Sequence, residues 1–370
     1  METKLVRIAE ISATSKHPIF TSVYHLINED MLKQCHKELD GNKAVGIDKV
    51  TKDEYGKNLD RNIKELVQRL KNKSFKSLPS LRVYIPKGNG KKRPLGIASY
   101  EDKIVQMAVK KILGAIYEPR FLNCMYGFRP NRGCHEAIKE VYQRISYGKI
   151  SYIVDADIKG FFDHIDHDWM MKFLEWNIQD KNLLWLIRKY LKAGIMEQGK
   201  FEPTEEGSAQ GSVMSPMLAN IYMHHVLTLW FKLVVQREMQ GECFLVNFAD
   251  DFVAGFQYKS EAERYYKELK ERMEKFEQKV RAYKNWIYDN RNRPMREIIK
   301  ELNVKLIGHY RYYGVTWNFR KITTFLHRVQ QFLFKAMNRR GCRRAYTWNG
   351  FVEMLKYYPL AKPKTYYCLY

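Results

Sequence analysis

Two adjacent aspartates, Asp250 and Asp251, stand between two short apolar runs, residues 243–248 and 252–256. Short apolar runs separated by so few residues are typical of two strands joined by a tight turn. Because the turn of a hairpin lies at one end of a sheet, this stretch predicts two carboxylates held together at a sheet end. We therefore take this acidic turn as the feature around which the rest of the chain is organised.

A third carboxylate, Asp157, closes another apolar, strand-like run that begins at residue 150. Carboxylate oxygens are the ligands that the hard cation Mg²⁺ prefers. Two strands that end in carboxylates can hold a pair of Mg²⁺ ions. Two ions about 3.5–4 Å apart clamp the attacking and leaving oxygens of a phosphoryl transfer. The pattern therefore indicates two-metal chemistry on phosphates.

The charge of the chain indicates a polyanionic partner. It has 64 Lys and Arg against 41 Asp and Glu, which gives a formal net charge of +23. Such an excess favours nucleic-acid binding with release of counterions. Aromatic residues make up 14% of the chain, so rings are present on which unpaired bases can stack. The alternative, from charge alone, is a basic protein without a nucleic-acid partner.

Length and cysteine use narrow the class of protein further. A chain of 370 residues predicts about two to three domains. The six cysteines are scattered and form no C-x-x-C pair, which argues against a zinc ribbon and against a disulfide scaffold. No uninterrupted apolar run approaches the roughly 20 residues that span a bilayer. We expect a protein of a reducing cytoplasm that has no membrane partner.

Apolar residues recur at helical spacing through much of the chain. Helices are expected at residues 31–39, 59–70, 104–116, 136–145, 167–176, 181–191 and 216–230. Beyond residue 260 the pattern is helical throughout, in segments 260–276, 280–289, 294–307, 319–338 and 348–358. Residues 81–85 and 93–97 instead alternate as two strands around a turn.

That turn carries lysines and is flanked by Lys87 and Arg93. Its functional interpretation is a clamp on a triphosphate, because Arg gives paired hydrogen bonds and Lys a point charge. The alternative is an exposed, solvated hairpin, and the local pattern favours this alternative.

Two further loops are candidates for ligand contact. The loop of residues 126–135 carries Arg129 and Arg132, which could hold a nucleotide phosphate or a template. The Gly/Ser-rich loop of residues 207–216 runs into an apolar helix and could face a base pair or a sugar. The alternative for this loop is a simple helix start with Pro216 in the first turn.

The order of these pieces is more specific than any one of them. The segments RPLGI, YGFRPNRGCH, DADIKGFFDHIDH, GSAQGSVMSPMLANIYM and FADD follow one another along the chain. In this order the chain resembles a bacterial group II intron reverse transcriptase, also called an intron-encoded maturase. The tail segments HYRYYGVTWN and TWNGFVEMLKYYPLAKPK resemble the thumb and maturase region of that family. The similarity extends from about residue 31 onward.

This resemblance implies an α+β fold of the right-hand polymerase type, with an antiparallel palm sheet and a helical thumb. Residues 1–145 would form the fingers and N-terminal region with contributions to the palm, residues 146–276 the palm, and residues 277–370 the thumb and maturase-like region. The implied activity is RNA-directed DNA polymerisation, together with a splicing role on intron RNA. The implied partners are an RNA template, intron RNA, a DNA primer and dNTPs, in a bacterial cytoplasm.

The resemblance also implies roles for single residues. Asp157, Asp250 and Asp251 would bind two Mg²⁺ ions, for which Mn²⁺ could substitute, and the backbone carbonyl of Ile158 would join them. Lys87 and Arg93 would grip the triphosphate. The ring of Phe162 would exclude a 2′-hydroxyl by its bulk. Gln210 and Gly211 would line the nascent base pair. No metal is assigned to Asp155 or Asp163, and Asp163 is expected to fix the palm loop.

The chain departs from the family pattern at three places. Ala98 replaces a proline after LGI, and Phe248 replaces the common tyrosine of the acidic box. After Phe276 the chain lacks the Gly-Leu strand, the Lys-Thr pair and the Phe-Leu-Gly-Phe segment that supports the primer end. We expect an internally shortened palm with impaired polymerase activity, and an acidic hairpin left without a neighbouring strand.

Two alternative functions remain open at this point. One is a non-catalytic cofactor that binds intron RNA and assists splicing without using the carboxylates. The other is a reverse transcriptase of another retroelement or of a phage-defence system, although the tail HYRYYGV favours the intron family.

Overall fold

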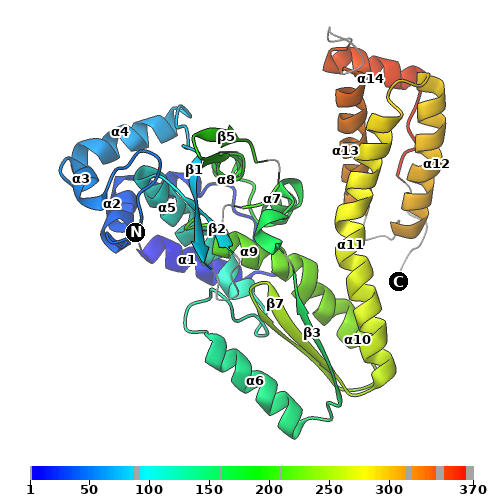
Figure 1. The fold of residues 1–370 in the computed structure, drawn as a ribbon, viewed down its shortest axis with the longest axis horizontal. Coiled ribbons are helices and arrows are strands. Elements are labelled where there is room, and N and C mark those ends of the chain that lie inside the picture. The colour runs from blue at the N-terminus through cyan, green and yellow to red at the C-terminus, as the bar shows by residue number, and fades with distance from the viewer. Residues whose placement is uncertain are drawn as a thin grey trace. The chain divides into compact units, whose positions relative to one another are not determined.

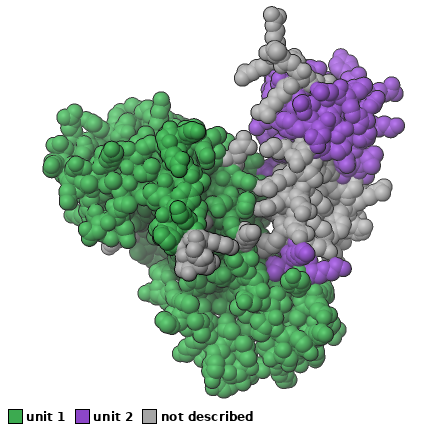
Figure 2. Space-filling view, in the orientation of Figure 1, with its two compact units in different colours: residues 1–266 green, residues 267–370 purple. Residues whose placement is uncertain are grey.

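The computed structural model describes residues 2–86, 92–158, 160–204, 206–208, 211–313, 319–338 and 346–363. The chain forms two compact units, residues 1–266 (unit 1) and 267–370 (unit 2), which Figure 2 colours separately. Each unit is described by itself. The division of unit 1 into fingers and palm, and the end of the palm at residue 276, stay predictions.

Unit 1 begins with a layer of helices whose apolar sides form its first core. These are α1 (Glu2–Thr14), α2 (Glu29–Glu38), α3 (Lys52–Gly56), α4 (Leu59–Lys71) and α5 (Tyr100–Tyr117). The four apolar residues of α4 that recur at helical spacing, from Ile63 to Leu70, are buried as expected. The side chain of Asn28 caps α2 by accepting a hydrogen bond from the backbone of Met31. Helix α1 was not expected from the sequence.

A mixed sheet of four short strands follows, in the order β2-β1-β4-β5. Its strands are β1 (Ser80–Pro86), β2 (Lys92–Ile97), β4 (Ile195–Glu197) and β5 (Lys200–Glu202). The predicted hairpin of β1 and β2 is present, with Leu81 opposite Ile97. Strand β1 also pairs in parallel with β4, and an ion pair of 3.3 Å joins Arg82 to Glu197 across these two strands.

The second sheet contains the acidic residues. Its strands β3 (Tyr152–Asp157), β6 (Cys243–Phe248) and β7 (Asp251–Phe256) are antiparallel and stand in the order β3-β7-β6. Helix α6 (Cys134–Tyr147) covers one face, where Ala137 packs with Phe244 and Val246. On the other face the rings of Phe231 and Tyr265 lie 6.3 and 5.0 Å from that of Phe256. Figure 1 shows this sheet between α6 and the helices around α10.

The remaining helices of unit 1 are α7 (His167–Glu175), α8 (Lys181–Leu191), α9 (Ser215–Met223) and α10 (Gln236–Glu238). Two π-helical stretches, His224–Thr228 and Phe231–Val235, lie between α9 and α10. Within the described residues, the helical stretch Ser215–Glu238 is long and apolar enough to cross a membrane, by length and composition alone, which the sequence analysis did not anticipate. Because 67% of its apolar window is buried inside the structure, it has the character of a core helix.

Unit 2 is helical. Its helices are α11 (Lys259–Asp289), which begins in unit 1, α12 (Met295–Tyr313), α13 (Phe319–Met337) and α14 (Trp348–Tyr357). Its core includes Leu302 and Leu306 of α12, Leu333 of α13 and Phe351 of α14. Helix α11 is continuous, whereas the sequence predicted separate helices before and after residues 277–279. These three residues include no Gly or Pro, so nothing there ends the helix.

The expectation that the acidic hairpin lacks a neighbouring strand is wrong. Strand β7 pairs along its whole length with β3, from Asp251 opposite Asp157 to Phe256 opposite Tyr152. Among the residues that the structure describes, every element after β7 is a helix. The outer strands of this sheet are therefore β3, whose Tyr152 and Ile153 are exposed, and β6, whose Asn247 forms an isolated bridge with Met125.

Candidate active site

The three predicted metal ligands lie together at one end of the second sheet. Asp157 at the end of β3 is directly opposite Asp251 at the start of β7. The backbone N–H of Ile158 donates a hydrogen bond of 3.3 Å to the carbonyl oxygen of Asp250. The pairing of Phe248 with Asp251 leaves Ala249 and Asp250 as a two-residue turn. The sheet register thus brings Asp157 to the acidic turn.

The carboxylates share one face of the sheet. Directly opposite residues of an antiparallel pair point to the same face, and so do alternate residues of one strand. Asp251, Asp157 and Asp155 are therefore on a common face, and all three are exposed. Burial raises the pKa of the Asp251 carboxyl above its usual value, and the carboxylates of Asp250, Asp157 and Asp155 raise it further. This is the electrostatic situation that a bound cation would relieve.

These residues fit a divalent cation in kind and in backbone position. Carboxylate oxygens suit Mg²⁺, and the carbonyl oxygen of Ile158 has two lone pairs, of which one accepts a hydrogen bond of 3.1 Å from Phe161. In the described part of the chain, no group of three or more His, Cys, Asp or Glu side chains is arranged so that it could hold a metal ion.

The buried side-chain amide of Asn247 fixes the backbone of the acidic turn. The side chain of Asn247 is 1% exposed, and its Nδ2 donates to the carbonyl oxygens of Ala249 at 2.9 Å and Asp251 at 3.3 Å. Its backbone N–H donates to the carbonyl of Cys124 at 2.7 Å, and its own carbonyl accepts from Tyr126 at 2.8 Å. Asn247 thus ties the turn to the segment before α6.

That segment also supports the turn through Gly127. A Cβ at Gly127 would lie 2.4 Å from the backbone nitrogen of Ala249, so only glycine allows this approach. The side chain of Asn220 in α9 donates a hydrogen bond of 2.8 Å to the carbonyl of Gly127. Ala249 has a positive φ of 59°, which a non-glycine residue adopts only when its surroundings hold it there. Sequence reasoning missed all three supporting residues; an asparagine inside an apolar strand was the signal for Asn247.

Phe162 lies in a short 3-10 turn, Phe161–Asp163, directly after Gly160, whose φ is +65°. Its ring makes edge contacts with the rings of Phe161 at 5.5 Å and Phe128 at 6.5 Å between centroids. Phe128 is 51% exposed, so this aromatic pair faces solvent on the Phe128 side.

The glycine-rich loop packs between this turn and strand β2. The backbone of Ser208 donates a hydrogen bond of 2.7 Å to the carbonyl of Phe162. A Cβ at Gly207 would lie 2.7 Å from the carbonyl oxygen of Asp163, and one at Gly211 would lie 2.9 Å from that of Gly96. Both glycines have φ near +90° or above, at 89° and 100°. The structure therefore brings Gly211 close to β2 and Gly207 close to the Phe162 turn.

Three predicted nucleotide contacts are not placed. Lys87 and Gln210 lie outside the described residues, and so does the side chain of Arg93, whose backbone pairs with Ile85. Their roles stay predictions.

The interpretation of Arg129 as a phosphate ligand is wrong. Its side chain is 6% exposed and bonds Glu118 at 2.6 Å through Nε, while Nη1 donates to the carbonyls of Leu122 and Met125. This buried ion pair fixes the loop instead. Arg132 also bonds within the loop: its Nη1 and Nη2 donate to the backbone and side-chain oxygens of Asn123 at 2.7 and 2.9 Å, and its guanidinium lies over the ring of Tyr126.

Comparison with known proteins places this architecture among nucleic-acid polymerases. Residues 85–311 match the model of the family described as "Reverse transcriptase (RNA-dependent DNA polymerase)". The group II intron-encoded protein LtrA of Lactococcus lactis subsp. cremoris is 37% identical over 238 residues, which is 63% of this chain and 39% of that protein.

Two further relatives have the same identity of 37%. They are an uncharacterised 91 kDa protein in the cob intron of Schizosaccharomyces pombe, matched over 54% of this chain and 25% of that protein, and the protein YkfC of Escherichia coli K12, matched over 50% and 49%. The chain thus spans less than half the length of these relatives. A chain of a solved structure described as a partial Cas6-RT-Cas1–Cas2 complex matches over 71% of this chain and 42% of its own length, with 17% identity and a TM-score of 0.38.

Proposed function

Since the chain belongs to the reverse transcriptase (RNA-dependent DNA polymerase) family, we propose that it extends a DNA primer along an RNA template. The observation that carries this proposal is the sheet register that sets Asp157 opposite Asp251, next to Asp250. The proposed architecture is the right hand: fingers and N-terminal region in residues 1–145, palm in residues 146–276 and a helical thumb in residues 277–370.

In the proposed mechanism, Asp157, Asp250, Asp251 and the carbonyl of Ile158 hold two Mg²⁺ ions, or Mn²⁺ in their place. When bound, these ions supply charge neutralisation at the attacking 3′-hydroxyl and at the triphosphate of the incoming nucleotide. The protein's own contribution is mostly positioning. The turn of Ala249 and Asp250 is held rigidly by Asn247 and Gly127, so the carboxylates need little reorganisation of the backbone.

The nucleotide would lie between β2 and the Phe162 turn. Lys87 and Arg93 would hold its triphosphate by charge and hydrogen bonds. Phe162 would exclude a 2′-hydroxyl by its bulk, and Gln210 and Gly211 would line the new base pair. The approach of Gly211 to the carbonyl of Gly96 supports a narrow site at this place.

Primer extension on poly(rA)/oligo(dT) with Mg²⁺ tests the proposal. We expect DNA synthesis by the wild-type chain, weak because no strand follows β7 in the described residues, and none by Asp250→Ala. Asp155→Asn is the matched control: Asp155 lies on the same strand and face as Asp157 but is given no metal, so this variant should keep activity. No DNA synthesis by the wild-type chain, or equal synthesis by Asp250→Ala, would refute the proposal.

A second function, assistance of intron splicing, is favoured by the relatives whose printed names refer to introns and by the net charge of +23. In this role the chain would bind folded intron RNA independently of its carboxylates. Asp250→Ala should then leave splicing assistance intact while it abolishes DNA synthesis. A splicing assay with the same two proteins separates the two roles.

A further inference from the structure

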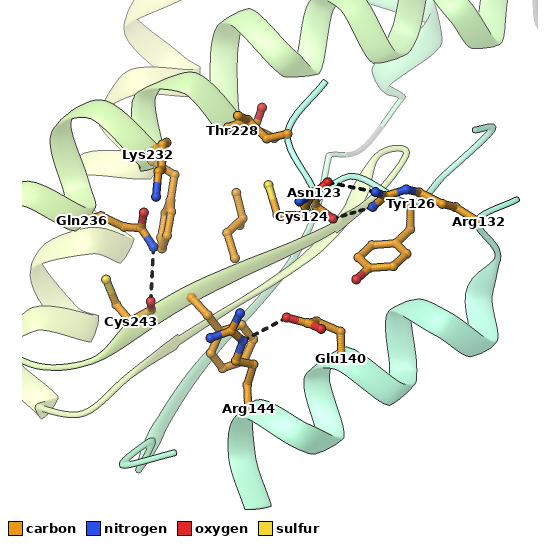
Figure 3. Close-up of a pocket in the computed structure, with 14 residues that line it drawn as sticks. Asn123, Cys124, Tyr126, Arg132, Glu140, Arg144, Thr228, Lys232, Gln236 and Cys243 are labelled. Carbon is orange, nitrogen blue, oxygen red and sulfur yellow. Dashed lines mark hydrogen bonds and ion pairs between the residues drawn. The ribbon is translucent and has the colours of Figure 1, made fainter. Parts of the chain in front are cut away.

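A cavity of about 480 Å³ lies along the β6 edge of the second sheet, at the start of this strand and away from the acidic turn (Figure 3). Its walls come from the segment of residues 122–126, from α6, from the π-helical stretch Phe231–Val235 and from the start of β6. This volume is within the range of roughly 300–1,000 Å³ that is usual for ligand sites.

The rim of the cavity is cationic. Three basic side chains from three different elements line it, Arg132, Arg144 and Lys232, against one carboxylate, Glu140. Glu140 accepts a hydrogen bond of 2.9 Å from Nε of Arg144, which leaves both Nη groups of Arg144 without a partner in the described part of the chain. Within the same residues, Lys232 makes no hydrogen bond or ion pair. Figure 3 shows Lys232 on the side of the cavity opposite to Arg132.

The three cations act on a common volume. Burial raises the pKa of the Cys124 thiol to about 11, and the charges of Arg129, Arg132 and Lys232 oppose this rise. The pKa of the Tyr126 hydroxyl is raised by burial and by the Glu140 carboxylate, and the charges of Arg132 and Arg144 oppose this rise. Because Cys124 and Tyr126 both line the cavity, its three cations act on the same walls, and only Glu140 among the lining residues opposes their charge.

The residues at the floor of the cavity favour a phosphate group over a nucleobase as its ligand. The rings of Tyr126, Phe244 and Phe231 are only 9%, 5% and 3% exposed, so they offer little face on which a nucleobase could stack. Guanidinium and ammonium groups with amide side chains beside them, here Gln236 and Asn123, instead suit phosphate oxygens. The chemistry of the cavity is that of a phosphate site rather than a base pocket.

We infer that this cavity binds a phosphate group of an RNA strand through Arg144 and Lys232, beside the charge of Arg132, as a second RNA contact remote from the acidic turn. The choice of RNA rests on the proposed function. Strand β6 carries Cys243 at the cavity and Phe248 beside the turn. At about 3.4 Å per residue these two positions are roughly 17 Å apart, so the phosphate held here is not one that reacts.

Fluorescence anisotropy with a labelled stem-loop RNA, measured over a range of salt concentrations, tests this inference. The double variant Lys232→Ala/Arg144→Ala should bind more weakly, and the slope of log K against log salt should shrink by about one per lost phosphate contact. Lys232→Arg should keep both quantities, because it retains the charge. Lys139→Ala is the matched control, a lysine on α6 that does not line the cavity, and it should behave as the wild type.

Equal affinity and equal slope for the wild type and the double variant would overturn the inference. Competition by inorganic phosphate distinguishes the source of the ligand. If the double variant lost its binding of inorganic phosphate but bound RNA as the wild type does, the cavity would be a site for a free anion, and the proposed RNA contact would be overturned.

Primer extension on poly(rA)/oligo(dT) is measured in parallel, so that failure of the polymerase proposal can be distinguished from failure of the proposed RNA contact. Retained synthesis by the double variant at saturating template supports a remote contact. A chain that never synthesises DNA, but shows the expected change of slope, defeats only the polymerase proposal.

Discussion

Asn247 and Ala249 are joined by a hydrogen bond of 2.9 Å, from the buried side-chain amide of Asn247 to the carbonyl oxygen of Ala249. Ala249 is the first residue of the turn that carries Asp250, and its positive φ is one that alanine seldom adopts. The same amide also bonds the carbonyl of Asp251. One polar side chain inside an apolar strand thus fixes the backbone on both sides of Asp250.

Asn247→Leu should reduce DNA synthesis more than it reduces the stability of the fold. The leucine leaves two turn carbonyls without their buried donor, at a cost of about 1–3 kcal/mol in the free energy of unfolding. Since a displacement near 1 Å can cost about 100-fold in rate, DNA synthesis should fall further than stability does. The Mg²⁺ concentration for half-maximal synthesis should rise, which a purely structural role would not cause. Urea unfolding and Mg²⁺ titrations of primer extension provide the measurements, and an unchanged Mg²⁺ requirement would contradict the positioning role.

Gly127→Ala should also disturb the acidic turn, by steric conflict. The added Cβ would meet the backbone of Ala249, which cannot move without breaking its bonds to Asn247. We expect a loss of about 1–3 kcal/mol in stability, as for other overpacked sites, with a loss of DNA synthesis. Gly114→Ala is the control: its Cβ meets only Met217 at an ordinary 3.7 Å within helix α5, so stability should be unchanged or higher. Equal effects of the two substitutions would argue against the close approach at Gly127.

The sequence was sufficient for the parts of the site that depend on local pattern. The strand runs ending at Asp157 and Phe248 predicted that the carboxylates gather, and the antiparallel register of β3 and β7 places their backbones together. The helices were predictable for the same reason, because their apolar residues repeat at the helical period. The continuity of α11 through residues 277–279 was missed because the prediction relied on family resemblance rather than on helix propensity.

The parts that could not be predicted depend on contacts between residues distant in sequence. Position 127 must be glycine because the backbone of Ala249 lies where a Cβ would be. Nothing near Gly127 in the sequence indicates that neighbour. Arg129 looked like a ligand because a loop arginine is usually exposed, but Glu118 pairs with it in a buried position. The same limit applies to the cavity at the start of β6 that is proposed to bind phosphate, because its three cations come from separate elements.

Asp102 gives the stability of unit 1 a pH dependence. This carboxyl is 2% exposed, and burial raises its pKa to about 6, although Ser99 and the backbone of Leu78 bond it. The pKa of Asp102 in the folded chain is above the unfolded value of about 3.9. The stability that the protonated carboxyl contributes is therefore complete below pH 3.9 and is lost as the pH rises through about 6.

Asp102→Asn should remove this dependence. The variant should become progressively more stable relative to the wild type between pH 4 and 7, by up to about 3 kcal/mol. Urea unfolding at several pH values measures the difference, and a constant difference across this range would show that Asp102 does not titrate there. Asp60→Asn, on an exposed position of α4, should show no such rise with pH.

Phe162→Ala should relax discrimination against ribonucleotides. Phe162 is held by the rings of Phe161 and Phe128, and its carbonyl is fixed by Ser208, so in the proposed site its ring would have little freedom to move away from a 2′-hydroxyl. Removal of the ring should raise the relative use of rNTPs by about 10–200-fold, the range expected for steric selection by one side chain. Primer extension with matched dNTP and rNTP series measures the ratio. Phe128→Ala removes one of the contacts of Phe162 but not its ring, so it should relax discrimination less; an equal effect would mean that Phe128, and not Phe162, excludes the hydroxyl.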